Sequence, residues 1–339
     1  MLQLDRGTVS ESKTGNPQAK FHYALAQLHV FRHEFTQAEQ EYRRAIEMDK
    51  SSLLLRTDLV ALLINLGKVE EAINEIEQAL SMDPRYIPMY LILGELNSSK
   101  GNHSKAEEAY KKVLEIDPSH EEALISLSVS LAREKKFSEA IANLEALISK
   151  KPRSAMGYYY LGKVYSAQQN YEKALQNLQK ARDIQPDSRT IIMELALVYE
   201  LSKKNQEAIR AYRELLQIDP NNVPALMRLG QIYLMEDQPD RALEYLNQAL
   251  LLRPKDDRIQ AKIGLVYLEK KEYEAAIRIF TELSAQKPEE DRYKYYLAMA
   301  YEGKGDLQSA ESQFKKFGAH SSVFVESRMH LAYILMEKG

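Results

Sequence analysis

The chain has 339 residues, of which 45% are hydrophobic and 28% are charged, with 46 Lys+Arg against 49 Asp+Glu. The formal net charge of -3 argues against a protein that mainly binds nucleic-acid phosphates. The absence of cysteine excludes disulfides, zinc–thiolate sites, iron–sulfur clusters and a cysteine nucleophile. No apolar run is long enough to cross a bilayer or to form a signal peptide, so we expect a soluble chain, cytoplasmic or periplasmic, without direct membrane insertion.

Residues 1–18 are polar and have no hydrophobic periodicity, which predicts a flexible leader. A period of 34 residues follows and continues without an insertion. Two residue types mark it: Pro84, Pro118, Pro152, Pro186, Pro220, Pro254 and Pro288, and Ala38, Ala72, Ala106, Ala140, Ala174, Ala208, Ala242, Ala276 and Ala310. With proline at position 32, the period defines nine repeats: 19–52, 53–86, 87–120, 121–154, 155–188, 189–222, 223–256, 257–290 and 291–324.

Each repeat is predicted to contain two helices. Apolar residues recur at steps of three and four, which is typical of helices, and strict alternation is absent. A short polar turn near position 15 separates the two runs, often with Gly or Asn, as at Gly67 and Asn170. Proline ends the second run because it cannot continue a helix. The sequence therefore predicts an all-α chain of antiparallel helix pairs.

Small residues at two positions predict how the helices of a repeat pack. Position 8 is small in all repeats but one, as at Gly94 and Gly230, and position 20 is always alanine. Such residues allow two helix backbones to approach closely. Larger residues at positions 11 and 24, such as Tyr165, Tyr212 and Phe280, are expected to fill the remaining space.

These positions resemble the tetratricopeptide repeat (TPR) family, whose pattern has Leu-Gly at positions 7 and 8, Tyr at 11, Ala at 20 and Pro at 32. Repeat 223–256 shows it with Leu229-Gly230, Tyr233, Ala242 and Pro254. The resemblance covers residues 19–324. It implies a right-handed superhelical α-solenoid, in which the first helices line the concave side.

The resemblance also implies which positions of the first helix line a groove for a partner: 2, 5, 6, 9, 12 and 13. Many of them carry Tyr, Met or aliphatic residues, which suit a peptide or an amphipathic segment of a protein. The alternative is that neighbouring helices bury these side chains. The predicted groove residues are Tyr23, Leu91, Ile92, Ile125, Val129, Tyr159, Tyr160, Lys163, Met193, Leu197, Met227, Arg228, Met235, Arg258, Lys262, Arg292, Tyr295, Tyr296 and Met299.

Charges at the same positions differ along the chain. Acids prevail in the earlier repeats, and bases in the later ones: Asp58, Glu95, Glu122, Glu194 and Glu200 against Arg228, Arg258, Lys262 and Arg292. A partner with one basic and one acidic end would be oriented by such a pattern. Ordinary solvated charges on helix faces are the alternative interpretation.

No catalytic, metal or cofactor site is predicted. His22, His29 and His33 have helical spacing, but the first two occupy packing positions. Phosphate-binding glycine loops and nucleophile elbows are absent from the sequence. The lysine and asparagine patterns with which some TPR proteins hold a terminal carboxylate or a glycan substrate are also missing. The lysine doublets are scattered among acids, so we expect no nucleic-acid partner and no cofactor.

Residues 325–339 match the first helix of a tenth repeat, or a C-terminal cap. The match ends before a second helix, so we expect a fragment of a longer protein or an open end that mediates self-association. We therefore predict a non-catalytic scaffold that binds another protein or peptide. The alternatives are the TPR region of a bacterial secretion, pilus or exopolysaccharide assembly protein, or the regulatory arm of an enzyme.

Overall fold

The computed structural model describes residues 16–337, and all regular secondary structure in this range is α-helical. The chain divides after Asn170 into two compact bodies. The N-terminal body contains α1 (Pro17–Phe31), α2 (Phe35–Met48), α3 (Leu53–Asn65), α4 (Val69–Met82), α5 (Ile87–Ser99), α6 (His103–Ile116), α7 (Glu121–Arg133), α8 (Phe137–Lys150) and α9 (Ala155–Ala167). The C-terminal body contains α10 (Tyr171–Ile184), α11 (Arg189–Leu201), α12 (Asn205–Ile218), α13 (Val223–Met235), α14 (Pro239–Leu252), α15 (Asp257–Glu269), α16 (Tyr273–Gln286), α17 (Asp291–Lys304), α18 (Leu307–Phe314) and α19 (Phe324–Glu337).

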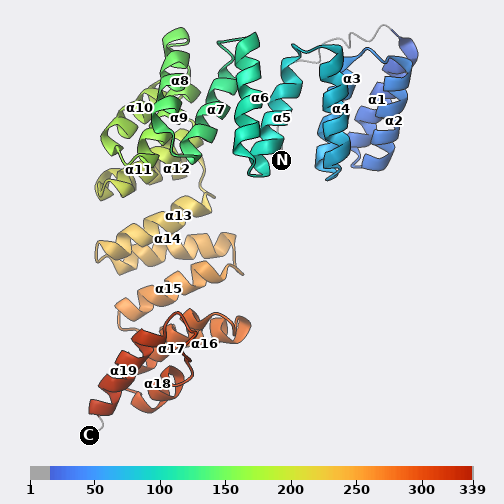
Figure 1. Cartoon of the computed structure of the whole chain (residues 1–339). Helices are drawn as coiled ribbons and strands as arrows, with labels where there is room; N and C mark the ends of the chain where they lie inside the picture. Colours follow the sequence, from blue (N-terminus) through green and yellow to red (C-terminus); the bar gives the residue numbers. More distant parts are fainter. Residues whose placement is uncertain (1–15, 338–339) are drawn as a thin grey trace. The chain divides into compact units, whose positions relative to one another are not determined.

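Within each body, successive helices lie side by side in chain order (Figure 1). Odd-numbered helices from α1 to α17 are the first helices of the nine repeats, and short turns connect each of them to its second helix. From α3 to α17, the first helices begin at position 1 of the predicted repeats. The predicted leader, residues 1–18, lies outside the described residues except at its end, where α1 already begins at Pro17.

Polar side chains at position 34 cap the beginnings of several first helices. The Ser52 hydroxyl accepts a hydrogen bond from the backbone N–H of Leu55, and the Ser154 hydroxyl and the Asn222 amide oxygen likewise accept from the N–H three residues later. Each satisfies an N–H group that has no partner inside the helix. Second helices end two residues before the proline of position 32. Helix α4 shows this at Met82, and the backbone N–H of Asp83 then donates to the Ala79 carbonyl.

The turn inside each repeat contains a residue with positive φ at position 15. Glycine holds this place at Gly67, Gly101 and Gly305. The other repeats have a residue with a side chain there: His33, Lys135, Gln169, Lys203, Asp237 and Lys271, with φ between 55 and 63°. The turn geometry is therefore common to all nine repeats, although its glycine is not.

The alanines of position 20 are fully buried in every repeat. At position 8, a Cβ on Gly230 would lie 2.6 Å from the Leu246 side chain of the second helix, which is closer than real Cβ atoms approach. The predicted close approach of the two helices is thus confirmed. Apolar clusters continue from pair to pair within each body, as in the cluster from Ala26 to Ile92 and that from Ile192 to Val266.

The last pair of the C-terminal body departs from the repeat. Helix α18 has only 8 residues, and irregular chain leads from it to α19. Leu331 and Ile334 of α19 pack on Phe314 and Phe317 in a small separate core. The outward face of α19 carries four apolar side chains at helical spacing, all more than half exposed: Val325, Met329, Tyr333 and Met336.

Candidate functional site

The first helices present side chains of positions 5, 6 and 9 at the margin of the core. Most predicted groove residues are half-buried there, among them Tyr23, Ile125 and Tyr160, whereas Met235 is largely exposed. Packing within the chain buries these side chains only in part, so some of their apolar area remains accessible. The groove as a continuous surface stays a prediction, because the residues belong to two separate bodies.

Two of the predicted groove residues are buried, which corrects the sequence-based assignment. Ile92 is 7% exposed and belongs to the apolar core of the N-terminal body. Tyr159 is 6% exposed: the ring of Tyr160 packs edge-on at 5.0 Å between centroids, and the Lys163 ammonium lies 5.4 Å from its ring centroid. Neighbouring side chains enclose both residues, so neither offers a surface to a partner.

At the beginning of the N-terminal body, one acid of the predicted groove is already satisfied. Asp58 of α3 accepts hydrogen bonds from the Tyr23 hydroxyl at 2.9 Å and the Gln27 amide at 3.0 Å. Burial raises the pKa of the Asp58 carboxyl, and burial and the Asp58 charge raise the pKa of the Tyr23 phenol. This closed network connects α1 to α3 and leaves little for a ligand to contact.

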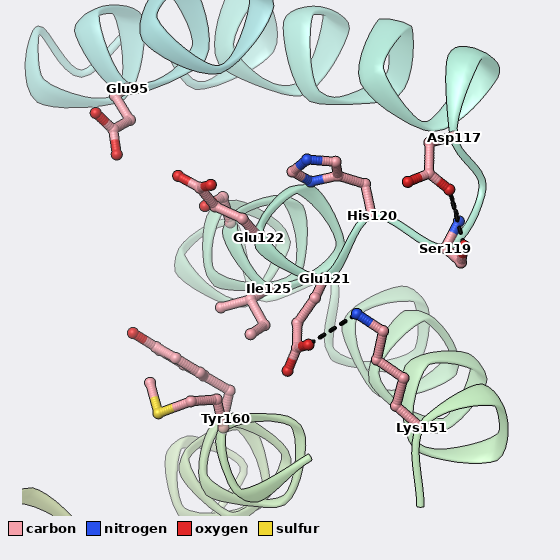
Figure 2. A pocket seen from close by; sticks show the side chains of 11 residues that line it. Glu95, Asp117, Ser119, His120, Glu121, Glu122, Ile125, Lys151 and Tyr160 are labelled. Atoms are coloured by element: carbon pink, nitrogen blue, oxygen red, sulfur yellow. Dashed lines mark hydrogen bonds and ion pairs between the residues drawn. The ribbon is translucent and has the colours of Figure 1, made fainter. Parts of the chain in front are cut away.

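A pocket of about 590 Å³ lies further along the N-terminal body, between α5, α7 and α9. Figure 2 shows the Glu95 and Glu122 carboxyls turned toward the same space, with Ile125 and Tyr160 on the adjoining wall. Its lining is completed by Asp117, Ser119, His120, Glu121, Ser126, Lys151 and Met156. The pocket therefore combines an apolar wall with several carboxylates.

The carboxylates of this pocket differ in how they are compensated. Glu121 accepts from Lys151 at 3.0 Å and from the Ser154 hydroxyl at 2.5 Å, and Asp117 accepts from Ser119 (Figure 2). Among the residues that the structure describes, neither Glu95 nor Glu122 has a hydrogen-bond or ion-pair partner. These two acids are the uncompensated charges of the pocket.

The environment of Glu95 disfavours its ionised form. Partial burial raises the pKa of its carboxyl, and the nearby charge of Glu122 raises it further. Burial, together with the charge of Glu95, also raises the pKa of the neighbouring Tyr110 phenol to about 12. The charges of Glu95 and Glu122 thus both act on Tyr110 of α6.

In the C-terminal body, predicted groove residues take part in packing and ion pairs. Met193, Leu197 and Met227 contact the apolar core. Arg228 of α13 donates to Glu200 of α11 at 3.0 Å, and the Tyr212 hydroxyl donates to the same carboxylate. The charge of Arg228 is therefore compensated within the body.

Lys262 of α15 lies beside this pair and donates to the Gln231 amide oxygen at 3.0 Å. Burial, and then the charge of Arg228, lowers the pKa of the Lys262 ammonium. The nearby Glu200 carboxylate, which already pairs with Arg228, acts in the opposite direction on the pKa of Lys262. The predicted basic side of the first helices stays a prediction.

The last predicted residues lie around α17. Tyr295 packs against Phe314 and Phe317 and its hydroxyl lies 3.1 Å from Nε2 of His330, so it helps to hold α19. Tyr296 contacts Phe280 with 5.2 Å between ring centroids and remains half-buried, as does Met299. These positions thus serve partly for packing.

Arg258 at the beginning of α15 and Arg292 at the beginning of α17 are both exposed. Each pairs with an acid two residues earlier, Asp256 at 3.0 Å and Glu290 at 3.6 Å. They line a polar hollow of about 520 Å³ with Lys255, Asp257, Lys287 and Tyr293. Four bases and three acids line this hollow, and Asp256, Asp257 and Glu290 each pair with one of the bases, so little charge remains for a ligand.

The described residues show no arrangement with evident catalytic chemistry. No group of three or more His, Asp or Glu residues in residues 16–337 is placed to hold a metal ion. His22 and His29 each lie 2.6 Å from a glutamate, Glu41 and Glu34 respectively. Within the same range, no helix has both the length and the apolar character of a membrane span.

The sequence placed Glu95 and Glu122 only among the charges of the groove positions. It did not indicate that they share a pocket with Tyr160, and it missed Met156. Met156 occupies position 2 of repeat 155–188, and Glu122 occupies the same position of repeat 121–154. The repeat position could therefore have indicated that Met156 lies near the same site.

Comparisons with known proteins agree with this architecture. Three models of the tetratricopeptide repeat match residues 32–96 and 200–265, residues 72–220, and residues 261–319. No protein with a curated description matches the chain.

Several solved structures share the fold. A tetratricopeptide repeat protein from Parabacteroides merdae is 18% identical, with a TM-score of 0.58 over 74% of this chain and 98% of that one. PilW, a type IV pilus biogenesis factor, is 20% identical with a TM-score of 0.55, over 61% of this chain and 96% of that one. PilF of Pseudomonas aeruginosa is 21% identical, with a TM-score of 0.52, over 62% of this chain and 96% of that one. Together with the repeat pattern and the helix pairs, the matches to the three repeat models lead to one conclusion: the chain belongs to the tetratricopeptide repeat family.

Proposed function

We propose that the chain is a non-catalytic scaffold that binds a partner protein or peptide on the faces of its first helices. The observation that carries this proposal is the N-terminal pocket, in which half-buried Tyr160 and Ile125 adjoin two uncompensated carboxylates. Aromatic and aliphatic area beside a few polar groups is typical of protein recognition surfaces. The half-buried Tyr296 and Met299 of α17 extend the proposal to the C-terminal body.

The experiment compares partner capture by the parent chain and by Tyr160→Glu and Tyr296→Glu variants, from a lysate of the source organism. Each substitution places a charge on apolar area in one body, so the two variants also show which body binds. Leu251→Glu is the matched control, because Leu251 is 81% exposed at the end of α14, a second helix. All variants must first show the circular dichroism and melting temperature of the parent.

A protein retained by the parent and the control, and lost with Tyr160→Glu or Tyr296→Glu, supports binding on the first helices. Binding of that purified protein is then measured directly by calorimetry. Equal capture by all four chains contradicts the proposal and moves the binding surface to the second helices or the turns.

The chain has a second surface of interest, the outward face of α19. Four apolar side chains form one stripe there, and exposed apolar stripes of this kind frequently mediate association. We propose that two copies of the chain associate through this face. The larger assemblies and the enzyme arm considered from the sequence stay hypotheses, since the likeness to pilus biogenesis factors concerns the fold.

A further inference from the structure

The N-terminal pocket has two chemically different walls. Glu95 of α5 and Glu122 of α7 supply carboxylates, whereas Ile125 of α7 and Met156 and Tyr160 of α9 supply apolar area. Three successive first helices thus contribute to one site. A ligand that fills the pocket must therefore compensate the carboxylates and contact the apolar side chains at the same time.

The charges of the residues that line the pocket determine the sign of the charge that a ligand must carry. Four carboxylates (Glu95, Asp117, Glu121 and Glu122) face the pocket against a single ammonium, that of Lys151, which already pairs with Glu121. Glu95 and Glu122 have no compensating partner in the described part of the chain. An anionic segment would be repelled, and a neutral one would leave both charges uncompensated.

The apolar wall determines the type of cation. Lysine and arginine carry their charge on an apolar stem, which can lie along Ile125 and Met156 while the charged group reaches the carboxylates. The exposed part of the Tyr160 ring offers a face to the same cation or to an apolar neighbour. A small hydrated ion would gain nothing from this wall.

We propose that this pocket binds a lysine or arginine side chain that is adjacent to an apolar side chain in a segment of the partner protein. The inference rests on the proposed function and names the chemistry of the partner for the N-terminal body. The basic group lies between Glu95 and Glu122, and the apolar neighbour covers Tyr160. The unfavourable ionisation of Glu95, whose pKa is raised by burial and by Glu122, is relieved when the cation binds.

The experiment selects peptides from a random 12-residue display library on the immobilised full chain, and in parallel on Tyr160→Glu. Peptides enriched only on the parent report on this pocket. We expect them to share Lys or Arg next to Leu, Ile, Met or an aromatic residue. Enrichment of acidic or uncharged peptides that depend on Tyr160 would overturn the inference and leave the proposed function standing. No Tyr160-dependent enrichment at all would contradict the inference, whereas the proposed function would then depend on the C-terminal body, which Tyr296→Glu tests.

The affinity of the most enriched peptide is then measured by fluorescence anisotropy. We expect Glu95→Gln, and replacement of the peptide's basic residue by Gln, each to weaken binding by about tenfold or more. Glu145→Gln is the matched control, because it removes the same charge from an exposed position of α8. If Glu95→Gln and Glu145→Gln change the affinity equally, only the net charge of the chain matters and the assignment of the pocket is wrong.

Discussion

Gly264 of α15 lies directly against the ring of Phe280 of α16, so closely that a Cβ on Gly264 would be 2.6 Å from the Phe280 Cζ atom. Phe280 is fully buried. The two residues occupy positions 8 and 24 of the same repeat, and Gly230 and Leu246 show the same relationship in the preceding repeat. In these two repeats the side chain of position 24 thus occupies the space that a side chain at position 8 would fill.

Gly264→Ala is expected to destabilise the chain by about 1–3 kcal/mol, because the added methyl group displaces the buried ring. Without that contact, alanine in a helix interior would instead stabilise by about 0.5–1 kcal/mol relative to glycine. Urea unfolding followed by circular dichroism measures the difference. Adding Phe280→Leu to Gly264→Ala should cost less than the sum of the two single variants, and an additive loss would show that the contact is unimportant.

Lys135→Gly is expected to stabilise the N-terminal body by about 0.5–1 kcal/mol. Lys135 has a φ of 62°, a left-handed conformation that is costly for a residue with a side chain, and its own side chain is exposed. Gly67→Lys, at the same position of another repeat, should destabilise by a similar amount. Thermal unfolding of both variants tests the pair, and a lower melting temperature for Lys135→Gly would contradict the argument.

Arg56→Met is expected to cost about 3 kcal/mol of unfolding free energy, since it leaves the Glu75 carboxylate poorly compensated in the interior. Arg56 donates to Glu75 at 2.5 Å and to Gln78 at 3.0 Å, and the side chains of the ion pair are 10% and 12% exposed. Arg43, at 3.8 Å from Glu75, is too distant to replace it fully.

The double variant Arg56→Met with Glu75→Leu should recover most of this loss, because no unpaired charge remains. The measurement is denaturant unfolding of the single and double variants. If the double variant is less stable than Arg56→Met alone, the ion pair contributes through something other than mutual compensation.

Glu95→Gln is expected to stabilise the free chain at pH 7 by about 0.5 kcal/mol after allowance for solvent screening, although it weakens partner binding. The raised pKa of Glu95 means that the folded state takes up a proton more readily than the unfolded state. The penalty of its charge is therefore present at neutral pH and disappears as the pH falls through the raised pKa. Unfolding curves of parent and variant should converge there, whereas a lower stability of Glu95→Gln at pH 7 would indicate a stabilising partner for the carboxylate.

Met329→Glu and Tyr333→Glu test the outward face of α19. Light scattering of the parent should show a mass that rises with concentration above the 39.0 kDa of one chain, and the variants should remain at that mass. Glu326→Gln, at the beginning of the same helix, is a control for the change in charge. A parent mass that stays at that of one chain at every concentration would show that this face does not mediate association.

Much of the fold follows from the sequence, because the repeat obeys local and nearest-neighbour rules. Proline at position 32 marks the end of the second helix in seven of the nine repeats, because proline cannot continue a helix. Alanine at position 20 and a small residue at position 8 indicate close helix pairs, and the burial of every position-20 alanine confirms this. The left-handed backbone conformation at position 15 is only partly predictable. Glycine indicates it in three repeats, whereas in the others a residue with a side chain adopts it at the end of the first helix.

The repeat, the helix pairs and the side chains that the first helices carry can all be read from the residue pattern. Which of these side chains are accessible depends on the assembled helices: Ile92 and Tyr159 are enclosed, whereas Tyr160 remains half-buried beside the pocket. The same holds for charge, because Asp58 is satisfied by a tyrosine of the neighbouring repeat, while Glu95 converges with another acid. The physical reason is that exposure and compensation depend on how neighbouring first helices cross, and the same periodic positions can be closed or open according to that angle.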